Sequence, residues 1–466
     1  MTRINTNVTS MISSRVLNTQ QNAMTKSLQR LSTGLRINSG ADDPAGLIAS
    51  EVLRGEQTAL KAAIANGQRA SNVISTAEGA LSEVSSLLSQ LEEAISSAAN
   101  TSGQSSDEIA AKQLQVDSIL STINRIANST DFEGIKLLNG SLDYKTSGTA
   151  ATSAFDNVTI KAATLADGAK MNVTVEVYGS AQLASINGKA SSMSANNTLQ
   201  ITGKYGTQVF SFAAGTTADQ VVAAVKDSST LTGVSAYKNS AGNAVFTSTE
   251  YGSDAFVTVD TISGTYALNT TDTGVDAKVR INGQDATAKG LTASINTNTL
   301  SMDLTMKTAV GTATGTKSFY VTGGGATFSL AADVMTGRTS IGIESVTTGS
   351  LGSATEGKIS SLADGQANSL SSDNFGKAQR IVKSAIKQVA SLRGRLGAFQ
   401  KLTIDSTVNS MNVALENTAA AESAIRDADF ATETANMTRS QILVQAATTV
   451  LKQANSAPQM ALSLLQ

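Results

Sequence analysis

Two carboxylates, Asp42 and Asp43, form one of the few patterns in this chain that resemble a reactive site. The chain has no His and no Cys, which excludes imidazole and thiolate nucleophiles, disulfides and metal ligands of either type. Adjacent carboxylates are candidates for acid–base catalysis, but these two stand directly before Pro44. An Asp accepts hydrogen bonds from the first turn of a helix, and Pro is tolerated at its first position. We therefore interpret the pair as a helix cap and expect no enzyme activity.

Two further patterns suggest a ligand and are better explained by turns. Asp272 and Asp276 have carboxylate spacing suited to calcium, but a closing Glu and a central Gly in register are missing. The run 323–325 is three glycines, but it lacks the Gly-Lys-Ser/Thr ending of a phosphate loop and precedes a strand-like run. We expect no metal and no cofactor.

Charge and hydropathy patterning exclude two classes of partner. The chain has 35 Lys and Arg against 37 Asp and Glu, without a basic block, so nucleic-acid binding is not expected. The sequence has no run of about 18 apolar residues, so no membrane span is predicted. Residues 1–10 lack the basic and apolar regions of a cleavable signal peptide. The absence of Cys suits a chain that passes between redox compartments without cross-linking.

Heptad spacing near both ends predicts helices that pack against other helices. Alternating steps of four and three place one small-residue stripe on each of two helices: Val73, Ala77, Ala80, Val84, Leu87, Leu91, Ala94 and Ala98 near the start, and Leu443, Ala447, Val450, Ala454, Ala457, Ala461 and Leu464 near the end. Small side chains bury little apolar area each, so such helices need several neighbours.

The first helix has an interrupted stripe, in which Arg15, Asn18 and Asn22 occupy positions where apolar residues are expected. Such a helix is not stable alone. We predict that its apolar residues and the last stripe together form the seam for polymerisation: Ile4, Val8, Met11, Met24, Leu28, Leu31 and Leu35 with Leu443, Ala447, Val450, Ala454, Ala457, Ala461 and Leu464.

Long helices are predicted over 44–99 and from about 377 to 415, with a shorter helix between 104 and 130. Their packing is assigned to Val73, Val84, Leu87, Leu91, Ile381, Leu392, Leu396 and Phe399. Asn139-Gly140 predicts a two-residue hairpin. Pro458 predicts a kink in the last helix.

Between about 140 and 370 the composition changes to Ser, Thr, Gly and Ala, and short alternating runs predict strands at 173–178, 199–202 and 255–259. Capping-box spacing over 217–220 predicts one short helix. Ser185-Ile-Asn-Gly188 and Arg280-Ile-Asn-Gly283 suggest two related β-rich units. The fold class is therefore α+β and multidomain, with helices at both ends and a β-rich region inserted between them.

Several blocks of this sequence resemble the bacterial flagellins. The N-terminal blocks read LQRLSTGLRINS at 28–39 and DDPAGL at 42–47, and FEGIKLLNG stands at 132–140. The C-terminal blocks read LRGRLGAF at 392–399, AIRDADF at 424–430 and QANSAPQMAL at 453–462.

The resemblance implies the domain organisation. Residues 1–41 with 421–466 would form an inner helical domain lining the filament channel. Residues 42–180 with 318–420 would form a long-helix domain with a β-hairpin, and 181–317 a variable outer domain containing the two repeat units.

The resemblance also implies location and partners. The subunit would be exported unfolded, without a cleaved signal peptide, and would polymerise outside the cell as a homopolymer. Its partners would be the flagellar export apparatus, a chaperone on the C-terminal helix, the filament cap and the hook–filament junction proteins.

One segment departs from the family pattern. In flagellins that activate a Toll-like receptor, the stretch matching 89–94 carries Arg where this chain has Gln90 and Glu92, whereas Glu93 is retained. Replacing a cation by an anion on a contact face is not conservative, so strong receptor activation is not expected.

Two other functions compete with that of a filament subunit. A hook–filament junction protein shares the terminal heptads, although the unbroken match through 425–430 favours the filament. A secreted adhesin would bind glycans through residues 181–317. An inserted metalloprotease is excluded because its His-Glu-x-x-His helix needs His.

Overall fold

The computed structural model describes residues 6–100, 103, 105–148, 150, 153–165, 170–188, 192–266, 268–333, 337–353, 355–372 and 374–463, with side chains described up to residue 456. The chain divides into two compact units. One comprises residues 1–67, 330–337 and 406–466, and the other comprises 68–329 and 338–405.

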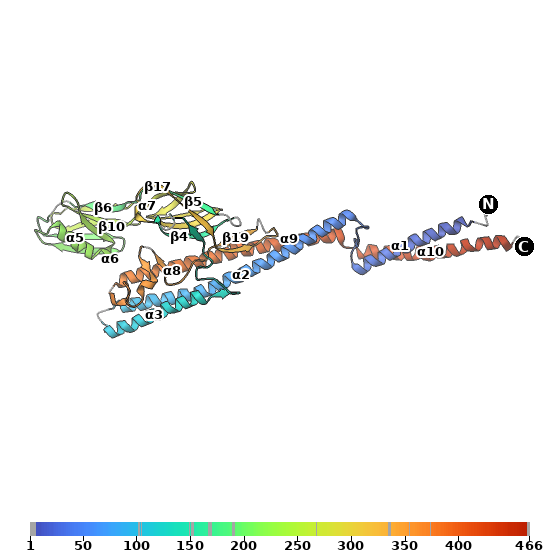
Figure 1. Ribbon diagram of the computed structural model, residues 1–466, viewed down its shortest axis with the longest axis horizontal. Helices are drawn as coiled ribbons and strands as arrows, with labels where there is room; N and C mark the ends of the chain where they lie inside the picture. The colour runs from blue at the N-terminus through green and yellow to red at the C-terminus, as the bar shows by residue number, and fades with distance from the viewer. Residues whose placement is uncertain are drawn as a thin grey trace. The chain divides into compact units, whose positions relative to one another are not determined.

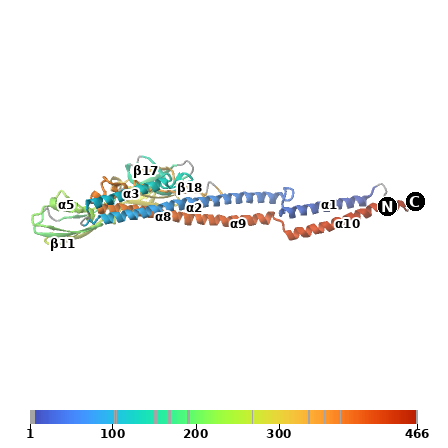
Figure 2. The same cartoon turned by 90° about the horizontal axis from the view of Figure 1, so that it is seen from below.

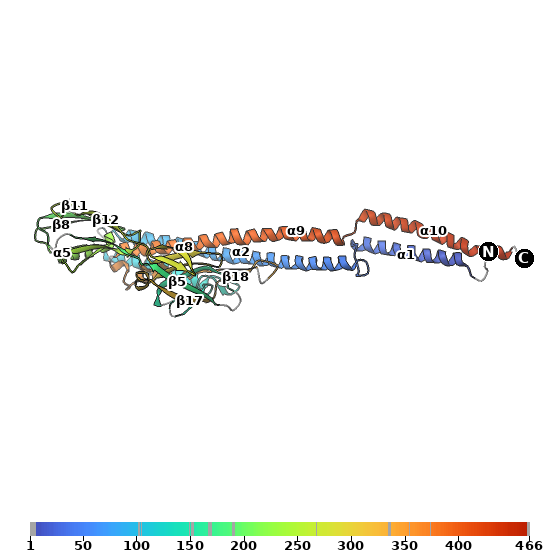
Figure 3. The same ribbon diagram turned by 90° about the horizontal axis from the view of Figure 1, so that it is seen from above.

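The first unit is built from helices. Helix α1 (Val8–Thr33) lies alongside α10 (Phe430–Ser463) (Figure 1), and the other two views show the same pair (Figures 2 and 3). The N-terminal part of α2 (Pro44–Ala98) and α9 (Ser406–Arg426) complete the unit. Helix α10 continues through Pro458, so the proline does not end the helix, and its side chain lies outside the described residues.

The turn between α1 and α2 explains the cap predicted from Asp42-Asp43. Gly34 ends α1 with a φ of +74°, which favours glycine. Asp43 Oδ1 accepts a hydrogen bond from the amide of Gly46 at 2.9 Å, which confirms the cap. A Cβ on Gly46 would lie 2.5 Å from Asp43 Oδ2 and 2.6 Å from Cδ1 of the buried Ile37. Glycine at 46 therefore lets both the capping carboxylate and Ile37 pack against the first turn of α2.

The second unit contains the rest of α2 together with α3 (Ser106–Ser129) and α8 (Phe375–Ala398). Lys112 Nζ on α3 donates to Ser97 Oγ on α2 at 2.7 Å, and Arg393 on α8 lies 3.9 Å from Glu78 on α2. The most buried face of α2 here has strict heptad spacing and consists of Ala70, Ile74, Ala77, Leu81, Val84, Leu88, Leu91, Ile95 and Ala98. It shares four positions with the stripe expected from sequence, whereas Val73 and Ala80 are only half-buried.

The tight hairpin lies earlier than the sequence predicted. Strands β1 (Asp131–Phe132) and β2 (Ile135–Lys136) are joined by Glu133-Gly134, whose φ values of +51° and +84° are both positive. The prediction of a hairpin at Asn139-Gly140 was wrong, because the two residues before it, Leu137 and Leu138, are both buried and do not alternate as a strand does.

Within the described part of the chain, the other strands fall into five sheets. The largest has the order β3-β17-β5-β13-β14-β15-β16-β4, and the others are β12-β11-β7-β8, β6-β10-β9, β18-β19 and β20-β21. Their bounds are β3 (Lys145–Ser147), β4 (Phe155–Ala163), β5 (Met171–Gly179), β6 (Leu183–Asn187), β7 (Asn197–Gly203), β8 (Gly206–Phe212), β9 (Val234–Lys238), β10 (Ala244–Tyr251), β11 (Phe256–Ser263), β12 (Asn269–Thr273), β13 (Lys278–Ile281), β14 (Gln284–Lys289), β15 (Thr292–Asn296), β16 (Leu300–Met306), β17 (Gly315–Gly323), β18 (Ala326–Ser329), β19 (Arg338–Ile341), β20 (Gly352–Ser353) and β21 (Gly357–Lys358). The short helices are α5 (Ala218–Asp227), α6 (Ser229–Thr232), α7 (Thr308–Gly311), η2 (Ile359–Leu362) and η3 (Leu370–Ser372). The three strands and the helix predicted in this region are confirmed by β5, β7, β11 and α5.

Among the described residues of the β-rich region, two hydrophobic cores can be distinguished. The larger core contains Phe155 and Phe319 and belongs to the eight-stranded sheet. The smaller core contains Phe246 and Val225 and lies under α5. The two sequence repeats lie in different settings. Residues 185–188 form the end of β6 and the position after it, in a three-stranded sheet, whereas 280–283 form the end of β13 and its turn to β14, in the eight-stranded sheet. The first repeat is followed by α5, an amphipathic helix long enough to cover a separate sheet. The second repeat is followed by α7, which has four residues and is too short to do so.

A polar cluster joins the smaller β core to α8. The Tyr205 hydroxyl donates to Glu356 at 2.9 Å and to Glu250, and burial with Glu250 raises the pKa of this phenol above its usual range. The Arg380 guanidinium lies 4.6 Å from the Tyr205 ring centre and donates to Glu356 at 3.0 Å. The cluster fixes strand β8 and its turn onto the long helix.

We expect Leu91→Ala to lower the free energy of unfolding by about 2–5 kcal/mol, because it removes a fully buried side chain from the α2 face. Chemical denaturation followed by circular dichroism measures the change. Gln90→Ala, at the neighbouring exposed position, is the matched control and should change stability by less than about 0.5 kcal/mol. Equal effects of the two substitutions would contradict this packing.

Candidate assembly surface

Helices α1 and α10 meet through fully buried small and polar side chains and through larger apolar side chains that are only half-buried. Most positions of α1 that lose solvent exposure follow heptad spacing, and so do most of those of α10. They are Ser10, Ser13, Leu17, Gln20, Met24, Ser27 and Leu31 on α1, and Glu433, Met437, Ser440, Val444, Ala447, Leu451 and Ala454 on α10. We call these fourteen residues the internal seam. Its buried members are Ser13, Ser27, Glu433, Ser440 and Ala447, so the pairing buries little apolar area.

Hydrogen bonds fix the register of the internal seam at both ends. Near the start of α1, Asn7 Nδ2 donates to the carbonyl of Ala454 at 2.8 Å, and Ser10 Oγ donates to Asn455 Oδ1 at 2.6 Å. Near its end, the buried Glu433 carboxylate accepts from Ser27 Oγ at 2.9 Å. The packing of these two helices specifies their alignment only weakly. Directional hydrogen bonds of this kind favour one alignment over the others.

The predicted polymerisation seam divides between the internal seam and the solvent. On α10, Ala447 and Ala454 belong to the internal seam, whereas Leu443 and Val450 beside them keep 40% and 57% of their side-chain surface exposed. On α1, the exposed members are Val8, Met11 and Leu28, and the half-buried members are Met24 and Leu31; Leu35, just after the helix, is also half-buried. Ile4 and Leu464 lie outside the described residues, as do the side chains of Ala457 and Ala461.

Several large apolar side chains were missed by the sequence stripes and are exposed in the first unit. They are Ile12, Val16, Ile48, Val52, Val413, Phe430 and Ile442. A heptad pattern finds only the residues of one stripe, so side chains on a second face of the same helix pass unnoticed. Exposed apolar side chains gathered on helices are typical of protein–protein contact surfaces.

The residues assigned to long-helix packing lie in the second unit. Val84, Leu87 and Leu91 on α2 and Ile381, Leu392 and Leu396 on α8 are buried, whereas Val73 is half-buried. Phe399, also half-buried, has its ring 6.2 Å from that of Phe328 near the β18–β19 hairpin.

The receptor-like segment lies on α2. Gln90 and Glu93 are exposed, while Glu92 is half-buried with its carboxylate 3.9 Å from Lys383 Nζ on α8. The anion at 92 is therefore partly neutralised by this chain.

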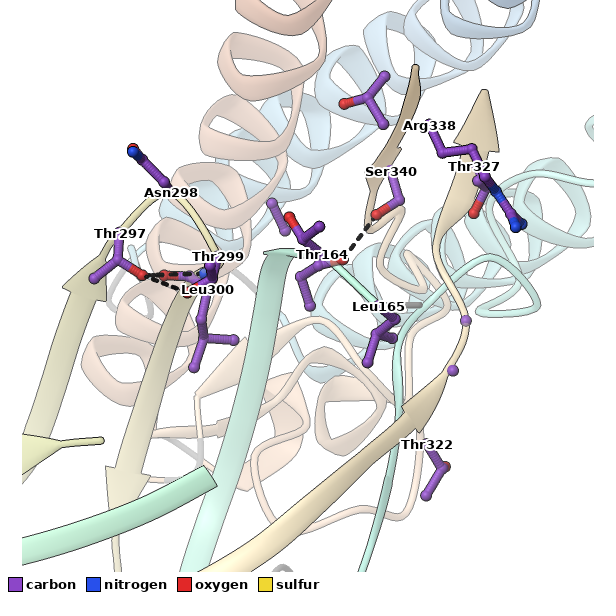
Figure 4. Close-up of a pocket in the computed structure, with 15 residues that line it drawn as sticks. Thr164, Leu165, Thr297, Asn298, Thr299, Leu300, Thr322, Thr327, Arg338 and Ser340 are labelled. Carbon is purple, nitrogen blue, oxygen red and sulfur yellow. Dashed lines mark hydrogen bonds between the residues drawn. The ribbon is translucent and has the colours of Figure 1, made fainter. Parts of the chain in front are cut away.

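A hollow of about 320 Å³ lies where the ends of β4, β16 and β17 approach the β18–β19 hairpin (Figure 4). Ser340 Oγ donates to the carbonyl of Ala163 at 2.9 Å on one side, and Thr297 Oγ1 accepts from the amide of Leu300 at 3.1 Å on the other. Among the described residues that line it, Thr is the most frequent type and no side chain is aromatic. Small-molecule sites are mostly apolar with a few placed polar groups, so this hollow lacks their character.

The part of the chain that the structure describes contains no group of three carboxylates that could hold a metal ion. Asp272 Oδ2 accepts from the amide of Ser185, and Asp276 Oδ1 from the amides of Ser253 and Gly290. Over the same described residues, no helix has the length and apolarity needed to cross a bilayer.

Asp42 forms an electrostatic contact that holds the α1–α2 turn. Its Oδ1 lies 2.7 Å from Lys26 Nζ, and its Oδ2 accepts from the amide and the hydroxyl of Ser39. The Lys26 ammonium and these hydrogen bonds hold the pKa of Asp42 well below its ordinary value of 3.8.

Comparison with known proteins agrees with this arrangement. The bacterial flagellin N-terminal helical region matches residues 4–143, the C-terminal helical region matches 380–465, and the flagellin hook IN motif matches 198–250. Flagellin D of Vibrio anguillarum is 30% identical over 463 residues, covering 99% of both chains. The chain belongs to the flagellin family.

Other flagellins match over the same length. Flagellin B of Vibrio anguillarum is 28% identical over 469 residues, and flagellin B of Vibrio cholerae is 29% identical over 464 residues, with 99% of both chains covered in each case. The crystal structure of the flagellar junction protein of Legionella pneumophila covers 81% of this chain and 99% of its own at 15% identity, but its TM-score of 0.29 is too low to support an inference. Flagellins are structural proteins, and this chain is a structural subunit of the extracellular flagellar filament.

We expect the contribution of Asp42 to depend on pH. Because its folded-state pKa is lowered, the contribution is present above about pH 4 and is lost as the pH falls through the folded-state value. Asp42→Asn should therefore lower the unfolding temperature at pH 7, and the difference from the parent should shrink below about pH 4. Glu56→Gln, at an exposed position of α2, is the control and should show no such change between the two pH values.

Proposed function

We propose that the exposed apolar side chains of α1 and α10 are the surfaces through which this subunit binds other copies of itself in the filament. The observation that carries the proposal is the division of one heptad stripe of α10. Ala447 and Ala454 face α1, whereas the larger Leu443 and Val450 of the same stripe remain 40% and 57% exposed among the residues that the structure describes. A second helix face of this kind favours a second helical partner.

The geometry of the exposed faces favours an open polymer. Val8, Met11 and Leu28 on α1 differ in size and spacing from Leu443 and Val450 on α10. A contact between two different surfaces is heterologous, and repeating it gives a helical array when the rotation does not close.

The terminal helices become rigid, in this proposal, only when neighbouring copies cover them. Their internal seam buries mainly Ser, Ala and Glu433, which stabilise a helix pair less than Leu or Ile do. Burial against neighbours then provides the free energy that orders the helices. A loosely held terminal pair is also easy to unfold for passage through a narrow export channel, and the absence of Cys prevents cross-linking on the way.

The remaining assignments follow from the family and stay with this proposal. Residues 1–41 with 421–466 form the inner domain, 42–180 with 318–420 the long-helix domain, and 181–317 the outer domain. The subunit is secreted without a cleaved signal peptide and carries no catalytic role. A chaperone covers the apolar face of α10 before export, and cap and junction proteins bind the ends of the filament.

We expect the double substitution Leu443→Asp with Val450→Asp to abolish polymerisation and to leave the free subunit folded, since both side chains are exposed in the subunit. Circular dichroism checks the fold, and sedimentation with electron microscopy checks filament formation. Buried in a contact, two unpaired carboxylates would oppose assembly strongly.

The matched control is Gln441→Asp with Thr449→Asp, which adds the same charge at exposed polar positions of the same helix. It should retain filament formation. Filaments of normal length from the Leu443/Val450 variant would refute the proposal, and so would equal loss in the control.

Amide hydrogen exchange tests the ordering on assembly. In the free subunit, we expect the amides of α1 and α10 to exchange within the shortest times measured, while those of the eight-stranded sheet stay protected. In filaments the same terminal amides should become protected. Full protection of both helices in isolated subunits would show that they do not need neighbours.

A further inference from the structure

The helix between α8 and α9 contains a π-helical segment, Phe399–Asp405. In a π turn the hydrogen bond spans one more residue than in an α-helix, so the segment holds one extra residue. Such turns are rare in α-helices and need a local cause. The spacing of the buried residues on the two sides of the segment supplies that cause.

The buried face changes phase by one residue across this segment. On the α8 side, Val382, Val389 and Leu396 follow at steps of seven. The next fully buried residue is Ile404, eight positions further, and Met411 follows it again at seven. A second row of positions shows the same extra step. The buried positions 378, 385 and 392 follow at steps of seven, the half-buried position 400 comes eight after 392, and the half-buried positions 407 and 414 follow again at seven.

In an uninterrupted α-helix, one residue in excess would rotate everything after it by about 100°. Met411 would then leave the cluster that it forms with Leu60 and Ala63 of α2. The π turn absorbs the excess residue, so that the same face of the helix stays buried on both sides.

Two contacts show where the excess is held. Gln400 Nε2 donates to Ser71 Oγ at 2.7 Å and to Ser75 Oγ at 3.2 Å on α2. Leu402, in the middle of the turn, keeps 73% of its side chain exposed. The π turn is thus hydrogen-bonded to α2 on one side and exposed to solvent on the other.

We propose that Phe399–Asp405 stores one residue beyond the seven-residue repeat and is a built-in point of local opening in this helix. Because the stored residue makes no buried contact, its removal closes the π turn into regular α-helix and preserves both buried faces. The proposal concerns the free full-length chain and is independent of polymerisation.

Deletion of Leu402 tests whether the π turn holds the one residue in excess of the seven-residue repeat. The chain has no Cys, so Cys pairs can report the facing of the helix on each side of the π turn through a short bismaleimide. One pair, Glu78→Cys with Arg393→Cys, reports α8, and the other, Gln57→Cys with Glu422→Cys, reports α9. Arg393 Nη2 lies 3.9 Å from Glu78 Oε1, and Gln57 Nε2 lies 3.2 Å from Glu422 Oε2. We expect both crosslinks to form in the Leu402 deletion as they do in the parent.

Deletion of Asn412, an exposed residue in the regular part of α9, is the matched control. It must rotate one of the two halves by about 100° and should lose at least one of the two crosslinks. Loss of a crosslink in the Leu402 deletion would overturn the proposal, as would retention of both crosslinks in the control.

Amide exchange tests the local opening. In the parent, the amides of 399–405 should exchange about tenfold faster than those of the flanking helices, and the Leu402 deletion should remove the difference. Uniform protection through this segment in the parent would contradict its role as a point of opening.

Discussion

Two helices whose fully buried contact positions are three serines, one alanine and one glutamate bury little apolar surface, and this constraint governs the ends of the molecule. A buried Leu or Ile stabilises a fold by about 1.5–3 kcal/mol relative to exposure, and small or polar side chains contribute far less. The terminal pair keeps its register through directional bonds at Asn7 and Glu433. Several of its larger apolar residues, such as Leu443 and Val450, stay exposed and are available to other molecules.

The β-rich region follows the opposite rule. Its two cores bury aromatic and branched side chains completely, as Phe246 and Phe319 show. These cores need no partner, and the Tyr205–Arg380 cluster ties the smaller of them to α8. The subunit therefore combines a part that is stable by its own packing with a part whose apolar surface is left for assembly.

Heptad spacing predicted correctly where helices form, but it predicted poorly which face of each helix is buried. On α2 the predicted stripe and the most buried face share Ala77, Val84 and Leu91, but the largest buried residues, such as Ile74 and Leu81, lie one position away. A helix with neighbours on two sides carries two overlapping stripes, and the sequence does not say which partner each one meets. On α10 the same ambiguity concealed the internal seam.

Local signals in the sequence determined the helices, the cap at Asp43, several strands and the capping box that begins α5, because each depends on residues within a few positions of one another. The family motifs determined the kind of molecule. Only the tertiary structure decided which strands share a sheet and that the helix after Ala398 needs a π turn. These features depend on the contacts of residues far apart in the chain, and neither propensity nor spacing along one segment records them.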